Sequence, residues 1–134
     1  AKMSVGQFVF MLHSHLPYYR KAGMWPFGEE NLYECMAETY VPLLNAISEL
    51  YDEGIKAKLT VGITPILAEQ LNDEHLKHGF VKYLNSRIEQ VSKDLERYPD
   101  PKVAHSQHLK YLAKYYFDWF NHIKDSYVNK YGMD

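Results

Sequence analysis

The first apolar run of the chain extends from Phe8 to Leu12 and ends at two histidines, His13 and His15. A run of this length, bounded by polar residues and a proline, is typical of a strand that is covered on both faces. Because side chains alternate along a strand, His13 and His15 share one face and Phe8 and Leu12 share the other. A second alternating run at residues 56–63 predicts a second strand.

Elsewhere the apolar residues recur at spacings of three and four, which predicts amphipathic helices. Their expected ranges are 29–54, 65–72, 74–98 and 106–127. Thr64 and Asp73 are the expected N-caps of the second and third helices, and Gly54 is a C-cap glycine. Pro42 should interrupt the first helix because it cannot donate a backbone hydrogen bond. Gly79 should weaken the first turn of the third helix.

The order strand, helix, strand predicts a parallel pair joined by a right-handed crossover. Two strands are too few to cover the apolar faces of the helices that accompany them. The sequence therefore predicts an α/β fold in which residues 1–134 form an incomplete domain, the opening portion of a larger barrel. In such folds the chemistry is placed at the carboxyl ends of the strands, where His13 lies.

Composition narrows the function classes. The 15 lysines and arginines nearly balance the 17 aspartates and glutamates, which gives no electrostatic case for nucleic acid or an acidic membrane surface. The apolar runs are too short to span a membrane, and the single cysteine, Cys35, fits a reducing compartment. We therefore expect a cytoplasmic protein without a membrane partner. The 12 tyrosines are core material first, although aromatic rings also stack on sugars.

The spacing His13-Ser14-His15 allows three interpretations. Two histidines at the end of a barrel strand are a metal-binding pattern of several metallohydrolases, but zinc would need a third ligand. They can also bind a substrate hydroxyl through hydrogen bonds. In the third interpretation they only cap the strand and satisfy loop carbonyls.

The loop from Leu16 to Gly28 is long and rich in aromatic residues, and ordered loops of this kind are often functional. Trp25 is its most informative residue. The indole is either a platform for a sugar ring or a local staple on Phe27 and the first helix.

The remaining polar residues favour structural roles. Glu29 and Glu30 suit a helix N-terminus, where carboxylates are stabilised by the helix dipole, better than an acid–base pair. Five histidines lie on or beside the predicted helices: His75, His78, His105, His108 and His122. Only His105 and His108 have the spacing of metal ligands, and such a pair is typical of a surface.

Four blocks in order carry a resemblance to a known family. They are HSHLPY at 13–18, WPFGEENLYE at 25–34, AETYVPLL at 37–44 and ITPILAEQL at 63–71. Together they resemble the N-terminal part of glycoside hydrolase family 57, and within it they are most similar to the 1,4-α-glucan branching enzymes.

The resemblance implies a distorted seven-stranded (β/α) barrel that acts on α-glucans with retention and without a metal or other cofactor. Its catalytic glutamate and aspartate come from later strands, so this chain would hold neither and would be inactive without the remainder of the catalytic domain. His13 matches the histidine that lines the donor-sugar pocket, His15 matches by motif, and Trp25 matches a tryptophan beside the cleft. These residues do not separate branching from disproportionation or hydrolysis. A metal-dependent hydrolase with its site at His13 and His15 is the alternative.

Overall fold

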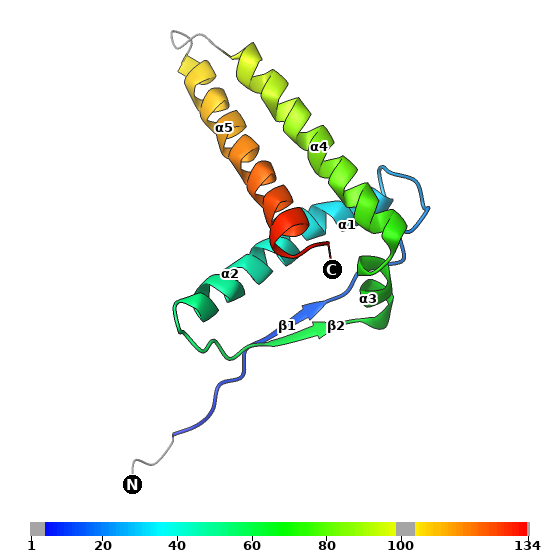
Figure 1. The fold of residues 1–134 in the computed structure, drawn as a ribbon, viewed down its shortest axis with the longest axis vertical. Coiled ribbons are helices and arrows are strands. Elements are labelled where there is room, and N and C mark those ends of the chain that lie inside the picture. Colours follow the sequence, from blue (N-terminus) through cyan, green and yellow to red (C-terminus); the bar gives the residue numbers. More distant parts are fainter. Residues whose placement is uncertain (1–4, 99–103, 134) are drawn as a thin grey trace.

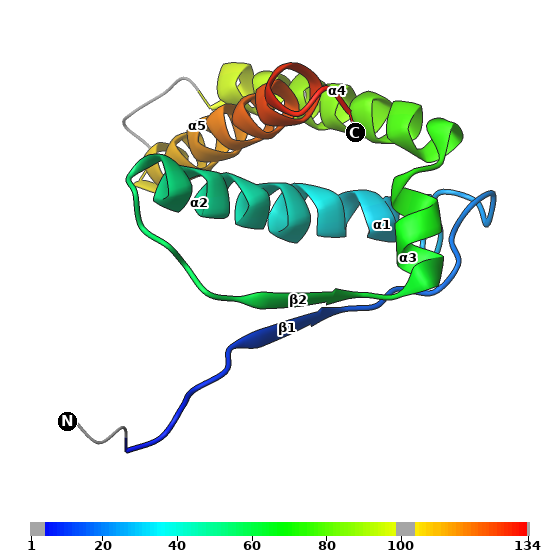
Figure 2. The ribbon, with the colours of Figure 1, turned by 60° about the horizontal axis from the view of Figure 1, so that its bottom comes forward.

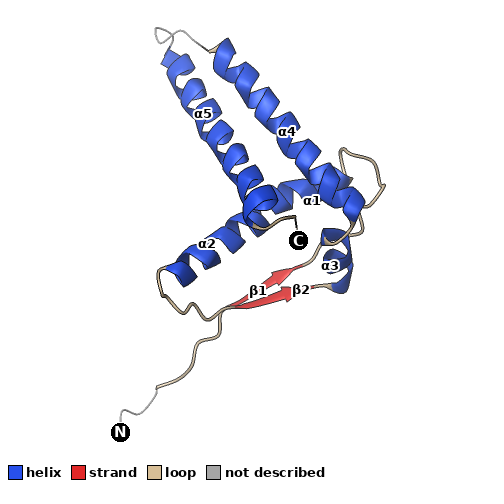
Figure 3. Ribbon diagram, viewed as in Figure 1, coloured by secondary structure: helices blue, strands red, loops and turns tan. Residues whose placement is uncertain are grey.

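The computed structural model describes residues 5–98 and 104–133. Both predicted strands and the four predicted helical segments are present (Figures 1 and 3). The elements are β1 (Met11–Ser14), α1 (Glu29–Cys35), η1 (Met36–Tyr40), α2 (Val41–Asp52), β2 (Thr60–Ile63), α3 (Pro65–Leu71), α4 (Glu74–Arg97), α5 (Ala104–Asp125) and η2 (Ser126–Lys130).

The elements form three layers (Figure 2). β1 and β2 pair in parallel at one side, which confirms the predicted parallel pair, with Leu12 opposite Val61 and Ser14 opposite Ile63. The helical segment α1–η1–α2 runs along one face of this pair, and the hairpin of α4 and α5 lies beyond it. Helix α3 follows β2 directly and lies beside the ends of both strands, so the loop after β1 passes close to three helices.

The predicted interruption of the first helix takes the form of a π-helical turn, η1, which ends two residues before Pro42. Proline cannot donate the hydrogen bond that would continue a regular helix, and the wider turn accommodates this without ending the helical path. The helix ends near Gly54, whose φ of 76° agrees with the predicted C-cap. Asp73 caps α4 by accepting a hydrogen bond from the Leu76 N–H at 3.1 Å. Thr64 occupies the predicted N-cap of α3, but its side chain makes no capping hydrogen bond.

The core lies between the helical layers. Leu32 and Tyr33 of α1 and Phe80 and Leu84 of α4 have no exposed surface. The ring of Phe80 meets that of Tyr127 edge to face, with 4.8 Å between centroids. Within the described residues, no helix is both long enough and apolar enough to cross a membrane.

The prediction that the first strand is buried on both faces is wrong for the part of the chain that the structure describes. Phe8 is 88% exposed and Met11 is 64% exposed. Met11 lies on the face of the sheet that the helices leave open, whereas Phe8 precedes β1 and lies beyond the paired part of the strands. Both strands are also shorter than predicted, because β1 and β2 pair over four residues each. The prolines that follow α4 in the sequence, Pro99 and Pro101, lie outside the described residues.

Candidate functional site

His13 lies at the carboxyl end of β1, on the sheet face opposite the helices. Its register partner is Gly62 of β2, and a methyl group at Gly62 would lie 3.2 Å from Nδ1 of His13. The absence of a side chain at Gly62 therefore leaves room for the imidazole above the neighbouring strand. The side chains of Ser14 and Ile63 alternate with those of His13 and Gly62 and therefore lie on the other face of the sheet. The helices cover that face.

His15 continues the face of His13, as the alternation predicts. The two rings are nearly parallel, with an interplanar angle of 13° and 6.5 Å between their centroids. Both residues are exposed. Two imidazoles thus face the same open side of the sheet, where either can donate or accept a hydrogen bond to a polar ligand.

A metal centre at these histidines would need a further ligand. Across residues 5–98 and 104–133, no group of three or more histidine, cysteine, aspartate or glutamate side chains is arranged to hold a metal ion. The metallohydrolase alternative therefore gains no support from the described part of the chain.

Trp25 lies in the loop between β1 and α1, and its side chain is 78% exposed. Phe27 is 80% exposed, so the two residues do not form the buried staple that was the alternative interpretation. The loop closes against the start of α1 through the Glu29 N–H, which donates to the Gly23 carbonyl at 2.9 Å. A Cβ at Gly28 would lie 2.0 Å from that carbonyl oxygen, so the closure requires glycine there.

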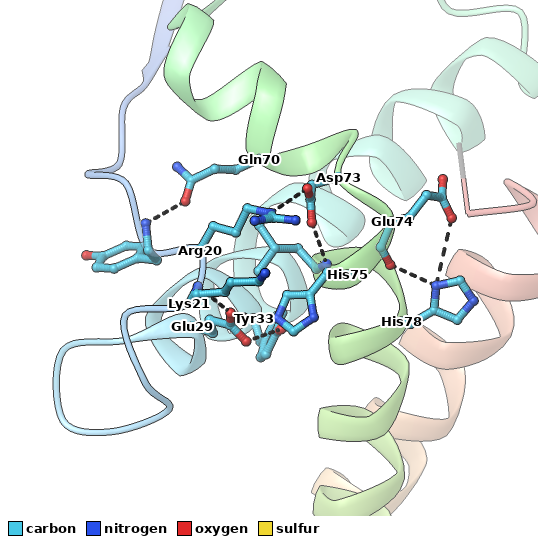
Figure 4. Close-up of polar contacts among 11 residues, drawn as sticks. Arg20, Lys21, Glu29, Tyr33, Gln70, Asp73, Glu74, His75 and His78 are labelled. Carbon is cyan, nitrogen blue, oxygen red and sulfur yellow. Dashed lines mark hydrogen bonds and ion pairs between the residues drawn. The ribbon is translucent and has the colours of Figure 1, made fainter.

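Polar side chains from three helices hold the part of this loop that precedes Trp25 (Figure 4). Gln70 of α3 bonds the main chain of Pro17 and Tyr19. Nε of Arg20 pairs with the carboxylate of Asp73 at 2.6 Å. The Lys21 N–H donates to the carboxylate of Glu29 at 2.7 Å.

Glu29 is the centre of this polar cluster and is 7% exposed. Besides the Lys21 N–H, its carboxylate accepts a hydrogen bond from the Tyr33 hydroxyl at 3.1 Å and contacts Nε2 of His75 at 2.8 Å. Burial by itself would raise the pKa of the Glu29 carboxyl. The hydrogen bonds from Lys21, His75 and Tyr33 outweigh burial and hold that pKa below its ordinary value.

The helix dipole explains only part of the surroundings of Glu29 and Glu30. Both lie in the first turn of α1, as the dipole argument predicts. Each also has a distant partner on α4, since Glu29 meets His75 and Glu30 pairs with Arg87. These partners lie 46 and 57 residues away in sequence, so no local spacing indicated them.

Gly79 also has a role that the helix pattern did not reveal. A Cβ at Gly79 would lie 2.0 Å from the hydroxyl oxygen of Tyr33. Glycine at this position of α4 therefore lets the Tyr33 hydroxyl occupy the space through which it reaches Glu29.

Known proteins share the sequence and the fold of this chain. The model of glycosyl hydrolase family 57 matches residues 9–131. The 1,4-alpha-glucan branching enzyme TK1436 of Thermococcus kodakarensis is 42% identical over 114 residues, which cover 85% of this chain and 17% of that protein. The probable 1,4-alpha-glucan branching enzyme Rv3031 of Mycobacterium tuberculosis is 40% identical over 79 residues, which cover 59% of this chain and 15% of that protein.

Two solved structures share the fold. The branching enzyme of Pyrococcus horikoshii superposes with a TM-score of 0.84 at 38% identity, over 94% of this chain and 22% of that one. The α-amylase AmyC of Thermotoga maritima superposes with a TM-score of 0.73 at 30% identity, over 92% and 23%. The chain thus spans about a fifth of the length of these relatives. The family match over residues 9–131 shows that the chain belongs to glycosyl hydrolase family 57.

Proposed function

We propose that this chain is the N-terminal part of a 1,4-α-glucan branching enzyme, in which β1 and β2 are the first strands of a distorted seven-stranded (β/α) barrel. The enzyme would transfer a segment of α-1,4-glucan to a glucan 6-hydroxyl. The 42% identity to TK1436 over most of this chain supports the proposal. A single cysteine, which fits a reducing compartment, supports a cytoplasmic location.

The observation that carries the proposal is the position of His13. It stands at the carboxyl end of a parallel strand, on the sheet face that the helices leave open. Active sites of parallel barrels lie at this end of the strands. We infer that the open face is the substrate face, and that His13 and His15 bind sugar hydroxyls there.

In the proposed reaction this chain binds the substrate, and the rest of the enzyme supplies the catalytic carboxylates. Retention requires a nucleophilic carboxylate and a carboxylic acid about 5–5.5 Å apart, which form and then break a covalent glycosyl-enzyme. We assign both groups to later strands. His13 would contribute a hydrogen bond to the donor sugar that strengthens as positive charge develops on the ring, and such a bond lowers the barrier to transfer. Trp25 would hold the glucan chain through its exposed indole face.

Hydrolysis of α-glucan is the second candidate, because the chain also superposes on the α-amylase AmyC. The two reactions share the glycosyl-enzyme and differ in its acceptor. A 6-hydroxyl yields a branch, whereas water yields a new reducing end.

The experiment incubates the purified full-length protein with amylose and counts α-1,6 linkages by proton NMR together with reducing ends. We expect α-1,6 linkages to accumulate while the number of reducing ends stays nearly constant. Reducing ends without α-1,6 linkages would identify a hydrolase. One equivalent of bound zinc, with activity that a chelator abolishes, would instead support the metallohydrolase.

A further inference from the structure

The segment between His15 and Trp25 is held more firmly than an exposed loop requires. Residues 17–21 have no strand or helix of their own, yet side chains of α1, α3 and the N-cap of α4 bond this segment (Figure 4). Three different helices therefore fix a five-residue segment that starts two residues after His15 and ends four residues before Trp25.

Gln70 makes two hydrogen bonds to the main chain of this segment, and only 1% of its surface is exposed. Its Oε1 accepts a hydrogen bond from the Tyr19 N–H at 2.6 Å, and its Nε2 donates to the Pro17 carbonyl at 2.9 Å. Nε2 also donates to the Ile66 carbonyl, one turn earlier in α3, at 3.3 Å. The amide thus satisfies a main-chain donor and a main-chain acceptor of the loop together, as a neighbouring strand would.

Asp73 and Glu29 contact the next two residues of the segment, Arg20 and Lys21. Asp73 pairs with Arg20 while it caps α4, so the loop is tied to the start of that helix. Glu29 accepts from the Lys21 N–H at a residue with a φ of 59°, a left-handed conformation that lysine adopts at a cost. That hydrogen bond offsets part of the cost.

We propose that Gln70 is a positioning residue for glucan binding: through Pro17 and Tyr19 it fixes the loop that joins His15 to Trp25, the residues proposed to bind the glucan. This inference rests on the proposed function. Misplacement of a binding group by about 1 Å can lower the rate roughly a hundredfold, so a loop that cannot shift would keep the binding groups in place. Without Gln70, the main-chain groups of Pro17 and Tyr19 would have to find water or move.

The test compares Gln70→Met with Asn45→Leu in the full-length protein. The methionine side chain keeps the length of glutamine and removes both hydrogen bonds to the loop. Asn45 is a matched control because it is also a buried amide, 6% exposed, and bonds Ser126 and Tyr131 at the opposite end of the helical layer. Each protein is assayed for amylose kinetics, thermal midpoint and amide hydrogen exchange over residues 16–28.

We expect Gln70→Met to accelerate exchange of the loop amides roughly tenfold or more and to raise KM for amylose roughly tenfold. Asn45→Leu should lower the thermal midpoint to a similar extent and leave both loop exchange and KM within about twofold of wild type. Gln70→Glu keeps the acceptor for the Tyr19 N–H and should lie between Gln70→Met and wild type.

Two failures are distinguishable. A wild-type protein without glycosyl transfer would contradict the proposed function before any variant is compared. An active wild type with a Gln70→Met variant that matches Asn45→Leu in KM and in loop exchange would contradict the positioning role alone.

Discussion

Replacing Gly79 by alanine should destabilise the protein, although alanine is the better helix former. At an ordinary helix interior the change would stabilise by about 1 kcal/mol. At Gly79 the added Cβ would lie 2.0 Å from the Tyr33 hydroxyl oxygen and 2.8 Å from Cζ of the same ring. Ordinary contacts between such atoms lie at about 3.5–4 Å, so the tyrosine would have to move by more than an ångström.

The ring of Tyr33 has little freedom to move. It is fully buried, and its centroid lies 6.1 Å from that of Phe80 and 5.7 Å from that of Tyr83. Overpacking of this kind costs about 1–3 kcal/mol. Displacement of the hydroxyl would also break its hydrogen bond to the buried carboxylate of Glu29, which costs about 1.5–3 kcal/mol. After the gain in helix propensity, we expect a net loss of about 1.5–5 kcal/mol.

The assay measures the free energy of unfolding by urea for wild type, Gly79→Ala, Tyr33→Phe and the double variant. Tyr33→Phe removes the hydroxyl that the new methyl group would strike, so Gly79→Ala should cost less in that background. A Gly79→Ala protein that is more stable than wild type would contradict this prediction, because helix propensity would then outweigh the contact with Tyr33.

Three further predictions concern the site. His13→Ala in the full-length protein should lower kcat about a hundredfold, which corresponds to about 2.7 kcal/mol of activation free energy. Its thermal midpoint should stay nearly unchanged because His13 is exposed. A variant that melts early but keeps its kcat would make His13 a structural residue. Trp25→Ala should raise KM for amylose and spare a small activated glycoside, and equal losses on both substrates would contradict a platform role. Because the pKa of Glu29 is held below its ordinary 4.5, the carboxylate adds stability above pH 4.5 that is lost as the pH falls through the lowered pKa. Glu29→Gln should therefore show a weaker loss of stability in acid than wild type, and identical acid profiles would contradict this.

The sequence was most informative where the structure depends on neighbours in the chain. Gly54 and Asp73 act at the predicted helix ends, since capping depends on residues within one turn. The shared face of His13 and His15 follows from strand alternation alone. Pro42 indicated an interruption, although not that it would be a π-helical turn.

The sequence was least informative about contacts that join distant segments. Gln70 lies in an ordinary amphipathic helix, and its bond to Tyr19 spans 51 residues. Gly79 was expected only to weaken a helix, because its contact with Tyr33 comes from packing of α4 on α1. The exposure of Phe8 has a similar origin, since a run of apolar residues does not say how many neighbouring elements will cover it.

We have proposed that the helix-free face of β1 and β2 is the substrate face. A crystal structure of the full-length protein with a bound maltooligosaccharide tests it most directly. We expect a sugar hydroxyl within about 3.2 Å of a ring nitrogen of His13, and the Trp25 indole against the glucan chain. A glucan bound elsewhere, with His13 covered by other parts of the protein, would contradict the account.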